Sequence, residues 1–143
     1  MFALIGAFIC GAMVALQAPT NAMLTRGVGS PVNAALVSFA IGTVALLVAA
    51  FALGARPVGA AMRGLPWYAW IGGLYGALFV ALAAFAAPRM GIVLFLTVAI
   101  AGQLAVGLLL DQFGAFGLPK VEIGAMRLAG VALVIIGVFL VRR

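Results

Sequence analysis

Ionisable side chains and cysteine are scarce in this sequence. Only 7% of its 143 residues are charged, two are acidic, one is cysteine and none is histidine. The absence of histidine removes the commonest general base, the commonest metal ligand and the usual physiological pH switch. The single cysteine, Cys10, excludes an intrachain disulfide and a cysteine metal cluster. The sequence therefore predicts no metal site and no cofactor.

Apolar side chains dominate instead. Hydrophobic residues make up 68% of the chain and the mean hydropathy is +1.38. Because a soluble domain carries about a quarter charged residues, this chain lacks the polar groups to cover a water-facing surface. A soluble enzyme, a disordered tail and a secreted disulfide scaffold are excluded. We expect the lipid bilayer to be its environment and its fold class to be all-α, polytopic membrane protein.

Five stretches are long and apolar enough to cross a bilayer, since a helical span needs about 20 residues. They lack the alternating ten-residue pattern of a membrane β-barrel, and five of the six prolines lie between them. The sequence predicts one five-helix membrane domain over residues 1–143. The expected spans are Ala3–Met23, Val32–Leu53, Trp67–Ala86, Gly91–Leu110 and Gly124–Val141.

The distribution of basic residues and the absence of catalytic motifs argue against nucleic-acid binding and against enzymatic activity. The eight lysines and arginines are scattered singly or in pairs around the apolar stretches, so they form no patch that could follow a phosphate backbone. Nucleic acid is therefore not an expected partner. The chain has no Ser/His/Asp set, no HExxH and no P-loop, and we expect it not to be an enzyme.

The sixth proline lies inside the first span among polar residues. Pro19 leaves the carbonyl of Ala15 without its helical donor and is predicted to bend the helix. Gln17 and Asn21 are four residues apart and share one helix face. Because a carboxamide facing lipid is costly, this face must look into protein or a wet cavity. Two interpretations stay open: interhelical hydrogen bonding, worth about 0.6 kcal/mol on average, or contact with a solute.

The other spans carry small residues and a few polar groups. A stripe of Ala34, Ser38, Gly42 and further alanines on the second span, and a GxxxG on the third, are typical of close helix packing. Tyr75 lies inside that GxxxG segment, where a buried phenol needs a partner.

In the fourth span, Gln103, Gly107 and Asp111 follow one another at intervals of four, so they share a face that ends at the membrane boundary. Asp111 is either an interfacial charge or a gate or ion-coupling group.

The distribution of positive charge bears on orientation. With five spans the termini lie on opposite sides, and the bias in lysine and arginine between the two sides sets the topology. Four basic residues fall on each side: Arg56, Arg63, Lys120 and Arg127 against Arg26, Arg89, Arg142 and Arg143. A chain without bias can insert both ways and pair with an inverted copy of itself. Such an antiparallel homodimer would be a ten-helix body, and inverted repeats with a midplane site are common in transporters.

Several motifs together resemble the YdcZ-like family of the drug/metabolite transporter superfamily. They are ALQ at Ala15–Gln17 with NAML at Asn21–Leu24, VSFAIGT at Val37–Thr43, LPWYAWIGGLYGA at Leu65–Ala77, PRMG at Pro88–Gly91, GQ at Gly102–Gln103 and LDQFGAFG at Leu110–Gly117. The resemblance covers nearly the whole chain. It implies a five-helix half transporter of the bacterial inner membrane that works as a dual-topology homodimer or with an oppositely oriented homologue. The distant small multidrug resistance relatives carry a glutamate in the first helix, where this chain has Gln17 and Asn21.

These observations predict a half-size secondary transporter that moves a small neutral or zwitterionic solute. A polar cavity would be lined by five residues of each copy: Gln17, Asn21, Ser38, Tyr75 and Gln103. An isolated cation would lack a counter-charge there. The alternatives are a non-transporting membrane subunit that scaffolds a partner, and a passive channel or facilitator.

Overall fold

The computed structural model describes residues 1–55 and 59–142. Three residues used above, Arg56, Pro57 and Arg143, lie outside this range. The described part is built from α-helices and short 3₁₀ turns without a strand, which confirms the all-α class. It forms two compact units, Met1–Arg89 and Met90–Arg143, each of which is described by itself.

The first unit begins with two long helices joined by a tight turn. Helix α1 spans Phe2–Val28 and α2 spans Pro31–Ala52. Gly29 ends α1 with φ +83°, a left-handed conformation that favours glycine. Ser30 caps α2 by accepting a hydrogen bond from the Asn33 amide at 3.1 Å. Pro31 is the first residue of α2, where its missing N–H costs nothing.

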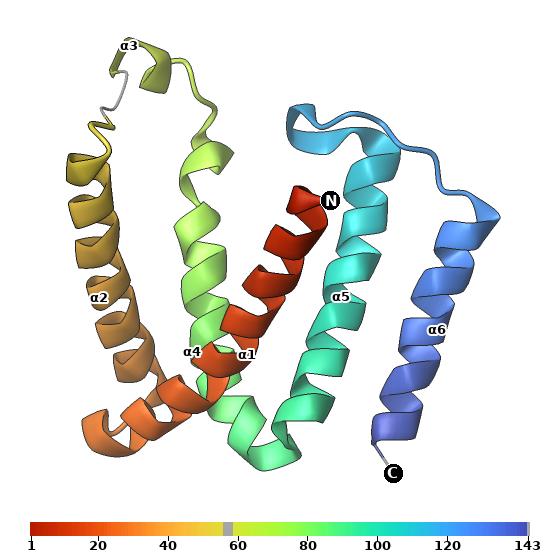
Figure 1. The fold of residues 1–143 in the computed structure, drawn as a ribbon, viewed down its shortest axis with the longest axis horizontal. Coiled ribbons are helices and arrows are strands. Elements are labelled where there is room, and N and C mark those ends of the chain that lie inside the picture. Colours follow the sequence, from red (N-terminus) through yellow and green to blue (C-terminus); the bar gives the residue numbers. More distant parts are fainter. Residues whose placement is uncertain (56–58, 143) are drawn as a thin grey trace. The chain divides into compact units, whose positions relative to one another are not determined.

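The buried apolar side chains of α1 and α2 are small. Ala18, Ala34 and Ala35 are buried, and the polar Asn21 is buried with them. Small residues allow two helix backbones to approach closely inside a membrane. Helix α1 runs through Pro19 without interruption, and its ribbon changes direction between the red and the orange parts (Figure 1).

The third long helix starts later than expected. Residues Trp67–Trp70 form a 3₁₀ turn (η1) after the short helix α3 (Gly59–Met62), and α4 spans Gly72–Met90 rather than 67–86. Aromatic side chains satisfy a hydropathy criterion but are weaker helix formers than leucine or alanine.

At the other end of α4, Pro88 lies within the last turn instead of after it. Only one backbone hydrogen bond is lost there, and the Arg89 guanidinium donates to the Phe85 carbonyl while lying 3.7 Å from the centre of the Phe85 ring.

The second unit is a pair of packed helices. Helix α5 spans Ile92–Phe113 and α6 spans Ala125–Val141, with a 3₁₀ turn (η2, Ala115–Gly117) between them. The connecting segment is fixed to the end of α5 by two hydrogen bonds. The Val121 amide donates to the Asp111 carbonyl at 2.8 Å, and the Ile123 amide donates to Gln112 Oε1 at 3.0 Å.

Four helices, α1, α2, α4 and α5, have 19 to 27 residues and are apolar enough to cross a membrane. The fifth, α6, is apolar but has 17 residues. At 1.5 Å per residue it reaches roughly 25 Å, slightly less than the hydrocarbon core of about 30 Å. Five apolar helices therefore occur in the order that the sequence predicts.

Gly76 offers a direct test of the contact between α4 and the Phe39 side chain of α2. A Cβ atom at this position would lie 3.2 Å from Cζ of Phe39, whereas one at Gly73 would meet nothing within 4 Å. We expect Gly76→Leu to destabilise the protein by about 1–3 kcal/mol, because overpacking displaces the ring. Gly73→Leu, the matched control, should have a much smaller effect in thermal unfolding in detergent.

The double variant Gly76→Leu/Phe39→Ala should recover most of the lost stability, since it removes the ring that the leucine displaces. Equal effects of leucine at Gly73 and Gly76, or no recovery in the double variant, would contradict the contact.

Candidate functional site

Two grooves run along the contact between α1 and α2, and we call them the α1–α2 grooves. The first has a volume of about 420 Å³ and is lined by Thr20, Asn21, Met23, Leu24, Ser38 and Ile41. The second has a volume of about 190 Å³ and is lined by Gln17, Ser38, Phe39, Gly42, Thr43 and Leu46. Ser38 lines both. The structure thus brings together three of the five residues predicted to bind solute.

Asn21 is the most buried of these polar groups. Only 4% of its surface is exposed, and it lines the first groove. Burying a carboxamide is costly unless it is hydrogen-bonded, which makes Asn21 a candidate contact for a molecule in the groove.

The depth of the grooves follows from the helix rise. Asn21 lies seven residues before the end of α1, and Ser38 lies seven residues after the start of α2. At 1.5 Å per residue both are roughly 10 Å from the α1–α2 turn, and Gln17, one turn further along α1, is roughly 16 Å from it. In a hydrocarbon core of about 30 Å, Gln17 would lie near the middle.

Hydroxyl groups on α1 bond to their own helix. Thr20 Oγ1 donates to the carbonyls of Leu16 and Gln17, at 3.0 and 2.9 Å. Thr25 Oγ1 donates to the Asn21 carbonyl at 2.8 Å. Sequence analysis did not single out Thr20, although a threonine directly after a proline in an apolar helix can supply a donor near the break.

The remaining two predicted residues lie elsewhere. Tyr75, on α4, is 62% exposed and does not line either groove. Gln103 belongs to α5 in the second unit. A single cavity that includes all five residues stays a prediction.

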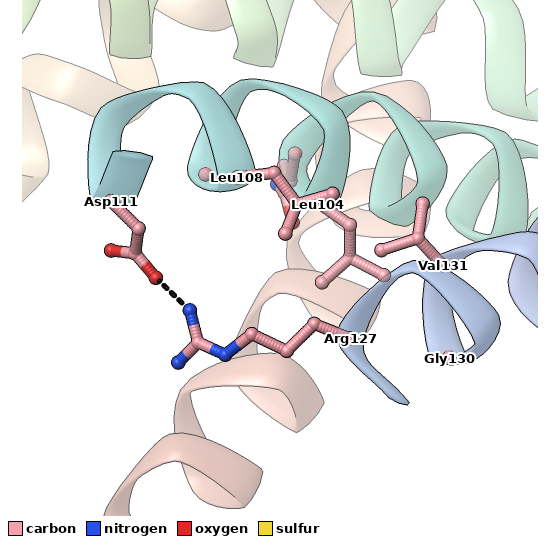
Figure 2. A pocket seen from close by; sticks show the side chains of 8 residues that line it. Leu104, Leu108, Asp111, Arg127, Gly130 and Val131 are labelled. Carbon is pink, nitrogen blue, oxygen red and sulfur yellow. Dashed lines mark hydrogen bonds and ion pairs between the residues drawn. The ribbon is translucent and has the colours of Figure 1, made fainter. Parts of the chain in front are cut away.

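The second unit has its own pocket, which we call the α5–α6 pocket. It has a volume of about 360 Å³ and is lined by Gln103, Leu104, Gly107, Leu108, Asp111, Arg127, Gly130 and Val131. Gln103, Gly107 and Asp111 line it together, in agreement with their spacing of four residues. Figure 2 shows the charged groups of Asp111 and Arg127 pointing toward each other, with Leu104, Leu108 and Val131 forming an apolar wall beside them.

Asp111 and Arg127 form an ion pair. Arg127 Nη1 donates to Asp111 Oδ2 at 2.8 Å, and the two side chains remain 45% and 37% exposed, respectively. An exposed pair of this kind contributes about 0–1 kcal/mol to stability. From the sequence, Arg127 is expected only to influence membrane orientation, and its pairing with Asp111 is not predicted. The available signal was its place in the first turn of one helix, opposite an acid in the last turn of the preceding one.

Both charges lie at the unfavourable end of their own helix. Asp111 is two residues from the C-terminus of α5, where the helix dipole is negative, and Arg127 is two residues from the N-terminus of α6, where it is positive. Helix stability alone would favour the opposite arrangement. The first turn of α6 also has no side-chain cap, because its N-cap is Gly124.

Comparison with known proteins gives one result. A family model described as "Putative inner membrane exporter, YdcZ" matches residues 2–140. No curated protein and no solved structure matches the chain.

The unfavourable charge placement predicts the effect of an exchange. In the double variant Asp111→Arg/Arg127→Asp, the ion pair can form again and each charge suits its helix end, so we expect a gain of about 0.3–1 kcal/mol for each charge. Either single variant should lose stability, because it brings two like charges together. Thermal unfolding of the three variants in one detergent measures this. A double variant less stable than both single variants would contradict the assignment.

Proposed function

This chain belongs to the YdcZ family of inner membrane exporters, and we propose that it is a half-size secondary transporter for a small neutral or zwitterionic solute. It is a multi-pass protein of the inner membrane, and its family is one of transporters, which are not enzymes. The observation that carries the proposal is the pair of α1–α2 grooves, in which Gln17, Asn21 and Ser38 lie between two membrane-spanning helices.

The chemistry of the α1–α2 grooves favours a solute without net charge. Their polar side chains are carboxamides and hydroxyls, which donate and accept hydrogen bonds but carry no charge. A lone cation or anion in this position would lack a counter-charge in a medium of low dielectric constant. The depth of Gln17 supports a site near the middle of the bilayer, where many transporters bind their solutes.

We propose further that two inverted copies assemble into the working transporter. The equal numbers of basic residues on the two sides of the membrane support insertion in both orientations. No residue of α5 or α6 is buried, and Tyr75 is largely exposed on α4, so apolar and aromatic surface is available for a second copy. The site would then combine Gln17, Asn21, Ser38, Tyr75 and Gln103 of both copies.

In this proposal Asp111 acts as part of a gate. Its carboxylate is engaged by Arg127 at one end of the α5–α6 pocket, and the pair is exposed enough to open and close at little cost. Because the Asp111 carboxylate is held in an ion pair, the role of a gate suits it better than the role of a proton carrier.

Dual topology predicts a specific reporter pattern. A C-terminal reporter active only in the cytoplasm and one active only in the periplasm should both give substantial signal with the unmodified chain. Two or three lysines added to either terminus should polarise the population, because the native bias is zero. A strongly one-sided signal from the unmodified chain would rule out the self-inverted homodimer and favour an oppositely oriented partner.

The role of the α1 amides is tested by Gln17→Leu and Asn21→Leu. We expect each to abolish stabilisation by those members of a panel of neutral, hydrogen-bonding solutes without an ammonium–carboxylate pair that raise the melting temperature of the native protein, while the dimer stays intact in size-exclusion chromatography. Thr97→Val is the matched control, because Thr97 Oγ1 donates to the Val93 carbonyl of its own helix at 2.7 Å and Thr97 lines neither of the α1–α2 grooves.

If the amides serve only to join helices, the leucine variants should dissociate while any remaining dimer still responds to solute. That outcome, or a panel in which no solute stabilises the native protein, would contradict the proposal.

A further inference from the structure

We propose that the α5–α6 pocket binds a small zwitterion of the α-amino acid type with an aliphatic side chain. The Asp111 carboxylate would accept the ligand's ammonium group and the Arg127 guanidinium its carboxylate. This pocket is lined by other residues than the α1–α2 grooves, so the inference goes beyond the proposed transport site.

The pocket offers two opposite charges next to each other. Arg127 and Asp111 are joined by a single hydrogen bond, Nη1 to Oδ2, within the described residues, so further guanidinium N–H groups and carboxylate lone pairs remain for a ligand. A ligand that carries an ammonium and a carboxylate group on the same carbon atom can replace this bond with two charge-assisted bonds. A ligand with one charge would leave the other protein charge unpaired in the pocket.

The helix ends reinforce this orientation. The negative end of α5 lies at Asp111 and attracts a cation, and the positive end of α6 lies at Arg127 and attracts an anion. This arrangement weakens each helix slightly. For a bound zwitterion, however, the helix dipole and the side chain at each helix end attract the same ligand charge. Helix stability does not explain why Asp111 and Arg127 lie at these helix ends, whereas binding of a zwitterion does.

The rest of the pocket defines the body of the ligand. Leu104, Leu108 and Val131 supply an apolar wall next to the ion pair (Figure 2), and Gly107 and Gly130 occupy little space on the two helices. The volume of about 360 Å³ is at the lower end of the range for ligand pockets, about 300–1,000 Å³, so a small aliphatic side chain suits it better than a large ring system.

The test uses L-leucine and two matched fragments of it. 4-Methylpentanoate has the same carbon skeleton and carboxylate without the ammonium group, and 3-methylbutylamine has the ammonium group without the carboxylate. Binding to the purified full-length protein is measured by calorimetry and by the shift in melting temperature. We expect L-leucine to bind and each fragment to bind at least roughly tenfold more weakly, because one charge of the pocket stays unpaired.

Two variants should change the selectivity in opposite directions. Asp111→Asn should abolish the preference for L-leucine over 4-methylpentanoate, because Arg127 is released for a carboxylate and nothing holds the ammonium group. Arg127→Gln should abolish the preference for L-leucine over 3-methylbutylamine. A purely structural ion pair predicts no such crossed change, since both variants would lower stability without altering the order of the three ligands.

The headgroup of phosphatidylethanolamine also carries an ammonium group and an anionic group, so it is a second possible source of the ligand. Two lipid compositions distinguish these sources. If the pocket binds the free zwitterion, L-leucine should have the same affinity in nanodiscs of phosphatidylglycerol as in nanodiscs of phosphatidylethanolamine. The proposal is overturned if L-leucine fails to bind, if the variants leave the order of ligands unchanged, or if only phosphatidylethanolamine stabilises the protein through Asp111 and Arg127. The result is independent of the α1–α2 grooves: Gln17→Leu should retain L-leucine binding in the α5–α6 pocket even if the proposed transport site is wrong.

Discussion

A polar side chain inside a bilayer needs either a protein partner or water, and the contact between α1 and α2 meets this constraint. Ala18, Ala34 and Ala35 are buried on the two helices together with Asn21, and Asn21 and Ser38 line the same groove. Small side chains allow helix backbones to approach closely inside a membrane, and here they accompany the polar groups that the proposed transport function uses.

Much of the fold was accessible from the sequence because the hydrophobic effect of the bilayer acts on stretches of about 20 residues. The five apolar stretches and the shared face of Gln103, Gly107 and Asp111 follow from composition and helical periodicity. The start of α4 did not follow, because Trp67–Trp70 is apolar enough to lie at a membrane interface but forms a 3₁₀ turn. Hydropathy reports where a residue is stable, not which backbone conformation it takes.

The sequence indicates the ion pair of Asp111 and Arg127 only weakly, for a different reason. Sixteen residues separate the two, and their meeting depends on a loop that contains left-handed backbone at Gly114, Phe116 and Gly117. Hydrogen bonds from Val121 and Ile123 to the end of α5 complete that loop. Such a course is set by several weak local interactions together, and no single motif indicates it.

In the proposed transporter the amide face of α1 lies along a water-filled path. Single cysteines at Gln17 or Ser38 in a Cys10→Ala background test this through their reaction with a hydrophilic maleimide in native membranes. Val44, an exposed apolar residue of α2 outside the grooves, gives the lipid-facing reference. We expect both groove cysteines to react much faster than a cysteine at Val44. Groove cysteines as unreactive as the one at Val44 would show that the amides are packed in a dry interface and would rule out a solute path along this face.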